Sequence, residues 1–231
     1  MRPYIVINGK ESTNVNGLMI QKLPPITRPK MRTEVEEIDG RDGDIVTPLG
    51  FSAYDKEIEI GLYGQYDVND VLSFFDTSGK ITFSNEPDKY YKFAIYNQID
   101  LEKLVRFRTA VVTMHVQPFK YSAIEGEVTT NTDSLTIRNR GNVVSKPRLS
   151  LTGEGILKVY LNENQIFQID MTTETIIIDS EELNAYAPDG TFLNRHVVGS
   201  YDDFVLKSGI NEITIDGTVT EMSILNYSRW L

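Results

Sequence analysis

The chain has 231 residues, of which 40% are hydrophobic, and 33 acidic against 23 basic side chains give it a formal net charge of −10. This composition is sufficient for a packed core in one large or two medium domains, and it excludes a disordered chain. The absence of cysteine excludes disulfides, thiolate chemistry and Cys-based zinc sites, and two histidines leave little material for a metal site or a catalytic triad. No run approaches 18 apolar residues and the start lacks a signal peptide's apolar run, so we expect a soluble protein made in a cytoplasm, without membrane insertion.

The charge is distributed unevenly along the chain. Residues 1–125 carry 15 basic and 18 acidic side chains, whereas residues 126–231 carry 8 and 15. The difference, from −3 to −7, supports two domains with these bounds. A negative surface disfavours tight binding of phosphate, and no Gly-rich phosphate loop occurs, so the sequence predicts no nucleotide cofactor and no specific binding of DNA.

The first elements in chain order are short strands joined by tight turns. Residues 4–7 form a β-branched run that ends at Asn8-Gly9, and a second Asn-Gly precedes the apolar residues 18–20. Asn-Gly between apolar runs predicts a hairpin turn, because both residues tolerate positive φ. Residues 23–29 contain Pro24, Pro25 and Pro29, which cannot occupy a central strand. We therefore expect an extended arm or edge there.

The next part of the first half alternates strands with one helix. Residues 30–38 and 45–63 read as strands, and within the second the alternation of Ile58, Ile60 and Leu62 with polar residues predicts one solvated face and exposed strand edges. Residues 67–78 break this pattern, because their apolar residues recur at helical spacing after Asp67, a good N-cap. Ser78-Gly79 is the expected stop of this one helix. Residues 80–84, 90–99 and 104–116 return to strands.

The acidic stretch of residues 39–44, between the expected strands at residues 30–38 and 45–63, allows three interpretations. A calcium loop that starts at Asp39 would put Arg41 where an oxygen ligand belongs, and its sixth and twelfth positions also fail. An Arg-Gly-Asp adhesion motif is absent, since the order is Arg41-Asp42-Gly43. The remaining interpretation is a turn built from two Asp-Gly pairs, with an arginine suited to pairing with carboxylates of a neighbouring subunit or left in solvent.

The second half reads as an antiparallel sandwich. Residues 117–127 look like the domain boundary, and short strands then recur every 8–12 residues with Gly, Asn and Asp turns between many of them. The expected strands are residues 135–138, 148–152, 156–161, 165–170, 175–179, 203–206, 212–215 and 222–227.

Candidate chemistry is sparse. His115 lies within a strand pattern, His196 in a loop, and no Gly-x-Ser-x-Gly elbow is present. The carboxylates select no glycosidase pair by spacing. The terminal Trp230 is expected to dock against the core, with sugar stacking as the alternative. We therefore predict no catalytic, cofactor or metal residues and no enzyme.

Taken in order, these features resemble the distal tail proteins of long-tailed, non-contractile bacteriophages. The likeness is carried by Gly40-Arg41-Asp42-Gly43, by the helix pattern of residues 71–75, and by the Gln-Pro-Phe of residues 117–119 that closes the first domain. It continues through residues 139–147, 176–180 and 199–211 to the Ser-Arg-Trp of residues 228–230, and so spans nearly the whole chain.

The resemblance implies a structural protein of the virion. In that family a β-rich N-terminal domain with one helix assembles six copies into a ring, and a galectin-like β-sandwich follows. The ring joins the tail tube protein to the tail tip or tail-associated protein and to receptor-binding or other baseplate proteins, and DNA passes through its channel. The galectins' His-x-Asn-x-Arg constellation is absent here, so sugar binding does not carry over.

The resemblance leads to a prediction for the subunit interface and leaves one alternative function. A closed ring needs two different patches that meet between neighbours, and we expect these to involve the arm (Pro24, Pro25, Pro29) or the turn (Gly40, Arg41, Asp42, Gly43). The alternative function is a β-sandwich module that binds a host surface or a glycan.

Overall fold

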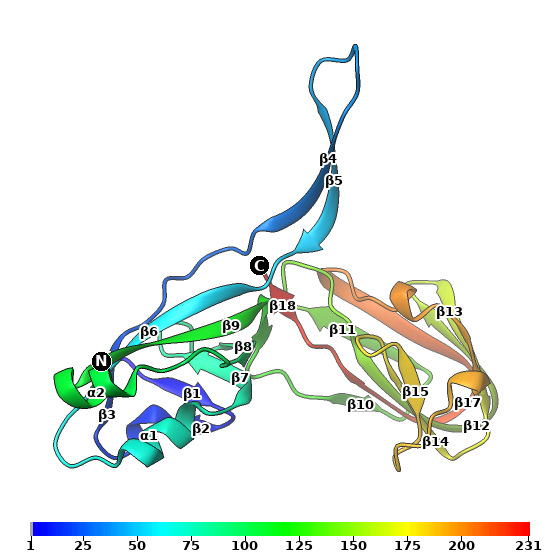
Figure 1. Ribbon diagram of the computed structural model, residues 1–231. Helices are drawn as coiled ribbons and strands as arrows, with labels where there is room; N and C mark the ends of the chain where they lie inside the picture. The colour runs from blue at the N-terminus through cyan, green and yellow to red at the C-terminus, as the bar shows by residue number, and fades with distance from the viewer. Residues whose placement is uncertain (1) are drawn as a thin grey trace. The chain divides into compact units, whose positions relative to one another are not determined.

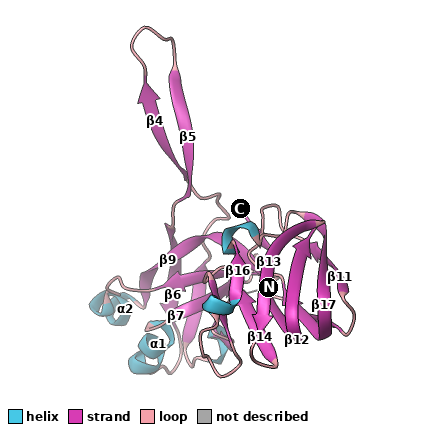
Figure 2. Cartoon of the chain, turned by 90° about the vertical axis from the view of Figure 1, so that its right-hand side faces the viewer, coloured by secondary structure: helices cyan, strands magenta, loops and turns pink. Residues whose placement is uncertain are grey.

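The structure is a computed structural model that describes residues 2–231. Contacts divide the chain into two compact units, Met1–Ala123 together with Leu231 and Ile124–Trp230. The prediction of a mainly β protein is confirmed, since antiparallel sheets account for both units (Figures 1 and 2). No helix in the described part of the chain is long and apolar enough to cross a membrane.

Unit 1 is built on one antiparallel sheet with the strand order β2-β1-β7-β8-β9-β6-β3. Asn8 and Gly9 have positive φ and turn β1 into β2, as their sequence predicts. The strands are β1 (Ile5–Ile7), β2 (Lys10–Glu11), β3 (Leu18–Lys22), β6 (Tyr54–Leu62), β7 (Ser78–Phe83), β8 (Lys89–Ala94) and β9 (Thr109–Ser122), with the 3₁₀ turn η1 (Ser12–Asn14) after β2. Because β6 lies between β9 and β3, the exposed edge expected at residues 57–63 is wrong.

The predicted helix is confirmed as α1 (Val68–Phe75), and its N-cap is Asp67, whose Oδ1 accepts the backbone N–H of Asn69 at 2.8 Å. It ends before Ser78-Gly79, because these residues already belong to β7. Val71, Phe74 and Phe75 are buried and anchor the helix to the sheet.

A second helix, α2 (Leu101–Phe107), corrects the prediction of a single helix and of a strand over residues 104–116. Asp100 caps it by accepting the N–H of Lys103 at 2.8 Å, and Arg108 ends it in the left-handed conformation. The β-branched residues after Arg108 form β9, so the predicted strand was right only in its second part.

The remaining strands of the first half, β4 (Met31–Glu37) and β5 (Asp44–Phe51), pair only with each other. In both views this hairpin extends away from the sheet of unit 1 (Figures 1 and 2).

Unit 2 has two layers that share their longest strands. β12 (Arg148–Leu161) pairs with β14 (Thr175–Asp179) through its first residues and with β13 (Asn164–Met171) through its last. β17 (Gly209–Leu225) pairs with β11 (Ser134–Asn139) and then with β10 (Val128–Thr130). The smaller elements are β15 (Asn184–Tyr186), η2 (Asn194–His196), β16 (Val197–Gly199), η3 (Tyr201–Asp203) and β18 (Arg229–Trp230).

β12 and β17 pass from one layer to the other at irregular positions. The glycines at these positions resemble turn glycines in the sequence. β12 and β17 lose their regular register at Gly153 and again between Glu154 and Lys158. A Cβ on Gly153 would lie 2.4 Å from the carbonyl oxygen of Thr218, so glycine is required for the close approach. The glycine turns predicted at residues 153–155 and 216–217 are therefore bends within continuous strands. The strands predicted at residues 148–152 and 156–161 are both part of β12, and those predicted at residues 212–215 and 222–227 both fall on β17, which ends at Leu225.

The core of unit 2 fills the space between these layers. It contains Leu149 and Leu151 from the first part of β12, Leu157 and Val159 from the second, and Phe204. The strand predicted at residues 203–206 is instead a 3₁₀ turn and a single bridge between Leu206 and Ser145. The galectin likeness of this unit stays a prediction.

The two ends of unit 2 are fastened to each other. Glu125 accepts the N–H of Ser228 at 2.5 Å and its hydroxyl at 2.6 Å, and it also accepts the Asn226 amide at 3.1 Å. β10 then pairs with the last part of β17, Val128 opposite Ile224.

Candidate assembly interface

The β4–β5 hairpin has no core of its own. Every residue from Met31 to Gly50 is exposed, on both faces of the two strands. Val35 and Val46 are direct cross-strand partners and are 52% and 56% exposed, and Leu49 is 52% exposed. A two-stranded hairpin is marginal in water without packing against other elements. The exposed aliphatic residues make this hairpin a candidate site of contact with another molecule.

The tip of the hairpin is the predicted turn. Glu37 pairs with Asp44, and Gly40 and Gly43 have φ of +80° and +79°, so two left-handed positions return the chain over residues 38–43. The N–H of Arg41 donates to the carbonyl of Ile38 at 3.1 Å. This places Gly40, Arg41, Asp42 and Gly43 in solvent, at the end farthest from the sheet.

The hairpin is fixed at its base. The Phe51 ring meets the Phe119 ring edge-to-face with 5.9 Å between centroids, and the guanidinium of Arg28 lies 5.9 Å from the Phe51 ring. The N–H of Ser52 donates to the carbonyl of Lys30 at 2.9 Å. These contacts hold the base of the hairpin, whereas residues 31–50 stay exposed.

The proline arm, residues 23–29, lies against unit 1. Pro24 and Pro29 are buried and only Pro25 is exposed. The amide of Asn85 donates to the Pro24 carbonyl at 3.3 Å, and the ammonium of Lys56 donates to the Pro25 carbonyl at 2.8 Å. Of the three prolines predicted for an interface, only Pro25 is exposed on the surface of the chain.

Lys56 is a buried cation among aromatic rings. Its ammonium lies 5.0 Å from the ring centroid of Tyr91 and 5.5 Å from that of Tyr54. Burial lowers the pKa of Lys56 to about 8, against an opposing effect of the Glu86 carboxylate. Glu86 accepts hydrogen bonds from the Tyr91 hydroxyl at 2.8 Å and from Lys120 at 2.9 Å. Burial, and then Glu86, raise the pKa of Tyr91. The cluster fastens the arm to the sheet.

The α2 helix forms a second exposed surface, which sequence reasoning missed. Leu104 is buried, whereas Val105 and Phe107 are 49% and 64% exposed. Lys103, Arg106 and Arg108 are exposed around them. The missed signal was Asp100, which as an N-cap followed by Glu102 is typical of a helix start.

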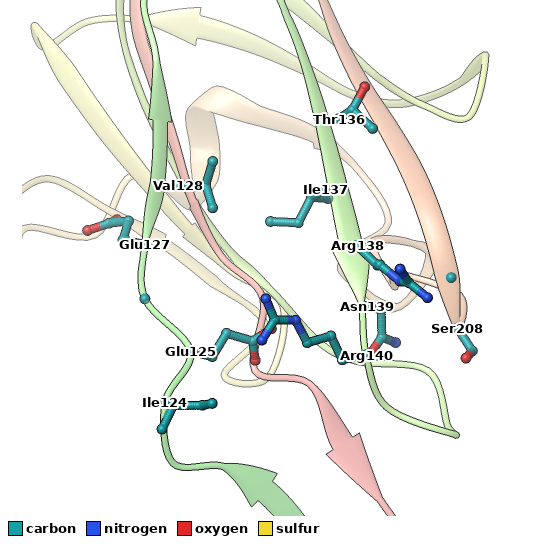
Figure 3. Close-up of a pocket in the computed structure, with 12 residues that line it drawn as sticks. Ile124, Glu125, Glu127, Val128, Thr136, Ile137, Arg138, Asn139, Arg140 and Ser208 are labelled. Atoms are coloured by element: carbon teal, nitrogen blue, oxygen red, sulfur yellow. The ribbon is translucent and has the colours of Figure 1, made fainter. Parts of the chain in front are cut away.

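A pocket of unit 2 has a volume of about 870 Å³ and lies between residues 124–128 and residues 136–140 (Figure 3). Its two carboxylates already have partners within the unit: Glu125 binds Ser228 and Asn226, and Glu127 accepts the Ser223 hydroxyl at 2.8 Å. None of the lining residues is aromatic, so the pocket offers no ring for stacking on a sugar.

The other singled-out residues have structural surroundings. His115 is half-buried in β9, and its Nδ1 lies 2.8 Å from Oδ1 of Asp55. His196 lies in η2, and Trp230 is half-buried in β18. No group of three or more His, Asp or Glu side chains with metal-binding geometry occurs among residues 2–231, and residues 39–44 form no such group.

Comparison with protein-family models and with curated proteins finds no match to this sequence. Solved structures do match. The chain is similar over 100% of both lengths to the Dit protein (gp 19.1) of phage SPP1, described as a paradigm of the hub of the adsorption apparatus in phages that infect Gram-positive hosts, with a TM-score of 0.72 and 18% identity.

Two further matches are chains of the phage P2 baseplate in its activated conformation. They cover 97% of both chains at 10% identity, with TM-scores of 0.53 for the calcium form and 0.51 for the strontium form. The resemblance drawn from the sequence is confirmed at the level of the fold, and it covers both units.

Proposed function

We propose that this chain is a structural protein of a bacteriophage tail, the distal tail component at the hub of the baseplate. The observation that supports this most is the match over the full length of both chains to Dit of phage SPP1. A partial match would support only a shared domain. Here the match covers both units.

The proposed mechanism is assembly into a hexameric ring. A ring requires a patch on each subunit that meets a different patch on the next, with a rotation that closes. The β4–β5 hairpin is suited to be one of these patches, because it is anchored at one end, exposed over twenty residues and aliphatic at Val35 and Val46. Its tip, Gly40 to Gly43, and the exposed Pro25 are the predicted interface residues that a neighbour can reach.

The ring would connect the tail tube protein to the tail tip or tail-associated protein and to receptor-binding or other baseplate proteins, in the tail of the virion. Its channel would let DNA pass without specific binding. The balance of 15 basic and 18 acidic side chains over residues 1–125 supports this, because tight binding of the phosphate backbone needs an excess of cations.

An enzymatic role has no support in the geometry. The carboxylates that line the pocket of unit 2, Glu125 and Glu127, are hydrogen-bonded to Ser223, Asn226 and Ser228, so neither is poised as a general acid or base. The lysine with a lowered pKa, Lys56, is 4% exposed and bonded to the Pro25 carbonyl.

The test is the mass and symmetry of the purified chain. Six copies of the 26.2 kDa chain give about 157 kDa. Light scattering across about 1 to 100 µM should show this species, and electron microscopy should show six-fold rings with a central opening. Particles with no six-fold ring at any concentration, alone or with the tail tube protein, would refute the proposal. Saccharide binding by the full chain on a glycan array would favour the alternative of a glycan-binding module.

A further inference from the structure

We propose that the β4–β5 hairpin of one copy docks onto the α2 surface of the next copy. The α2 surface consists of Lys103, Val105, Arg106, Phe107, Arg108 and the neighbouring Tyr63. This pairing rests on the proposed ring and names the two patches that close it.

The charges of the two surfaces are opposite. Residues 31–51 contain six acidic and two basic side chains. The remainder of residues 1–123 contains 13 basic and 11 acidic side chains, so the acidity of this half is concentrated in the hairpin. On α2, the acidic Asp100 and Glu102 lie at the start, and Asp100 is used as the cap. The three cations follow in the second half of the helix and at its end.

Both surfaces also expose apolar side chains in the midst of the charges. On the hairpin these are Val35, Val46 and Leu49, each more than half exposed. On the α2 surface Val105 and Tyr63 are each 49% exposed and Phe107 is 64% exposed. An apolar centre with charged surroundings is the anatomy of a protein interface, in which aliphatic and aromatic anchors supply affinity and charges supply orientation.

The α2 surface is held in place by the sheet beneath it. The carbonyl of Arg108 accepts the N–H of Leu62 at 3.0 Å, which sets Tyr63 beside the end of the helix. The guanidinium of Arg108 lies 5.9 Å from the Tyr66 ring, and that of Arg106 lies 5.5 Å from the Phe107 ring. These cations therefore stand over aromatic faces and keep their N–H donors free to pair with carboxylates.

The occupant is a second copy because the hairpin is uncovered in its own chain. Every residue from Met31 to Gly50 remains exposed after the chain has folded, so the surface that covers these residues belongs to another molecule. An acidic hairpin and a basic helix on each subunit meet the requirement for two unlike patches.

Charge reversal of each patch tests the pairing. One variant carries Glu34→Lys, Glu36→Lys and Glu37→Lys, and the other carries Lys103→Glu, Arg106→Glu and Arg108→Glu. Each alone should need more than about tenfold higher concentration for half-assembly, because like charges would face each other. An unchanged far-ultraviolet circular dichroism spectrum and melting temperature would show that both variants are folded.

Complementation gives the decisive readout. In an equimolar mixture, each copy's hairpin meets a patch of opposite sign on the other variant, so alternating rings with 1:1 composition should form at wild-type concentrations. A chain that carries both reversals should also assemble. The matched control, Lys10→Glu with Lys22→Glu and Lys80→Glu, changes the net charge equally on exposed lysines elsewhere in unit 1 and should keep the rings.

The outcomes separate the two proposals. If the wild type forms no ring, the proposed function fails and this pairing fails with it. If the wild type forms rings and the α2 variant assembles equally well, or if the mixture of variants stays monomeric, the pairing alone is overturned.

Discussion

Two antiparallel strand pairs of the first half follow the same local rules and differ in where their side chains are covered. In the β6–β9 pair, Ile58 lies opposite Val112 and neither is exposed. In the β4–β5 pair, Val35 lies opposite Val46 and both are more than half exposed. The first pair obtains its apolar contacts from the same chain. The chain leaves the apolar residues of the second pair uncovered, and the proposed assembly is what would cover them.

Removal of the hairpin tip should have the largest effect, because it should separate assembly from folding. Replacing residues 39–44 with Asn-Gly should abolish ring formation while unit 1 and unit 2 stay folded, because the tip contributes nothing to either core. Light scattering measures the assembly and circular dichroism the fold. The control replaces the exposed turn at residues 131–133 with Gly-Ser-Gly and should leave assembly intact. A tip-deleted chain that still forms rings would remove the tip from the interface.

Matched truncations of the two strand pairs should differ by the energy of a core. Ile58→Ala should lower the free energy of unfolding by about 3 kcal/mol, since it leaves a cavity under the sheet. Val35→Ala should change it by less than about 0.5 kcal/mol in the monomer. Urea unfolding below the assembly concentration measures both. Equal losses would mean that the hairpin is packed within its own chain.

Two glycines allow the same comparison, between the packed sheet and the exposed hairpin, to be made for the backbone. Gly17 and Gly40 both have positive φ, but a Cβ on Gly17 would lie 2.5 Å from Cβ of Tyr66, and one on Gly40 would meet nothing within 4 Å. We expect Gly17→Ala to destabilise unit 1 by about 2 to 3 kcal/mol and Gly40→Ala by about 1 kcal/mol or less. Thermal melts of the two variants, measured side by side, decide the order.

The smallest expected effect is a pH dependence of the free energy of unfolding, which arises at Lys56 in β6 and not in the hairpin. The pKa of Lys56 falls from 10.5 to about 8 on folding. The unfolded chain therefore binds more protons between these values, and the free energy of unfolding should rise with pH from about 8 to about 10, by roughly 1 to 2 kcal/mol. The raised pKa of Tyr91 acts in the opposite direction only above about 10.

Lys56→Met should remove this rise, whereas Arg41→Met, at the solvated tip, should keep it. Urea titrations at half-unit pH intervals provide the measurement. A rise that persists in Lys56→Met would assign it to another group.

The sequence predicted features whose causes are local. Asp67 and the helical spacing after it gave α1, and the Asp-Gly pairs gave the hairpin turn, because caps and positive φ depend on neighbours in the chain. It failed where tertiary contacts decide. β-branched residues after Leu104 suggested a strand, yet the Asp100 cap and the burial of Leu104 favour α2.

The candidate interface was predicted only in part for the same reason. Three prolines in residues 23–29 correctly excluded a central strand there, but no local signal indicated that Pro24 and Pro29 would be buried or that Lys56 would fasten the segment to the sheet. The Asp100 cap could have indicated the α2 helix, but not which of its side chains stay exposed, because exposure is a property of the folded unit. Glycines at bends of β12 and β17 resemble turn glycines for a similar reason, since only the paired strand shows that the ladder continues.

The Glu125 clamp on Ser228 and Asn226 has a mechanical consequence. Because the chain enters and leaves unit 2 at neighbouring points, a pull on its two ends would act on the clamp and the β10–β17 ladder first, opening them one bond at a time, and the doubly bent strands behind them would feel little of it.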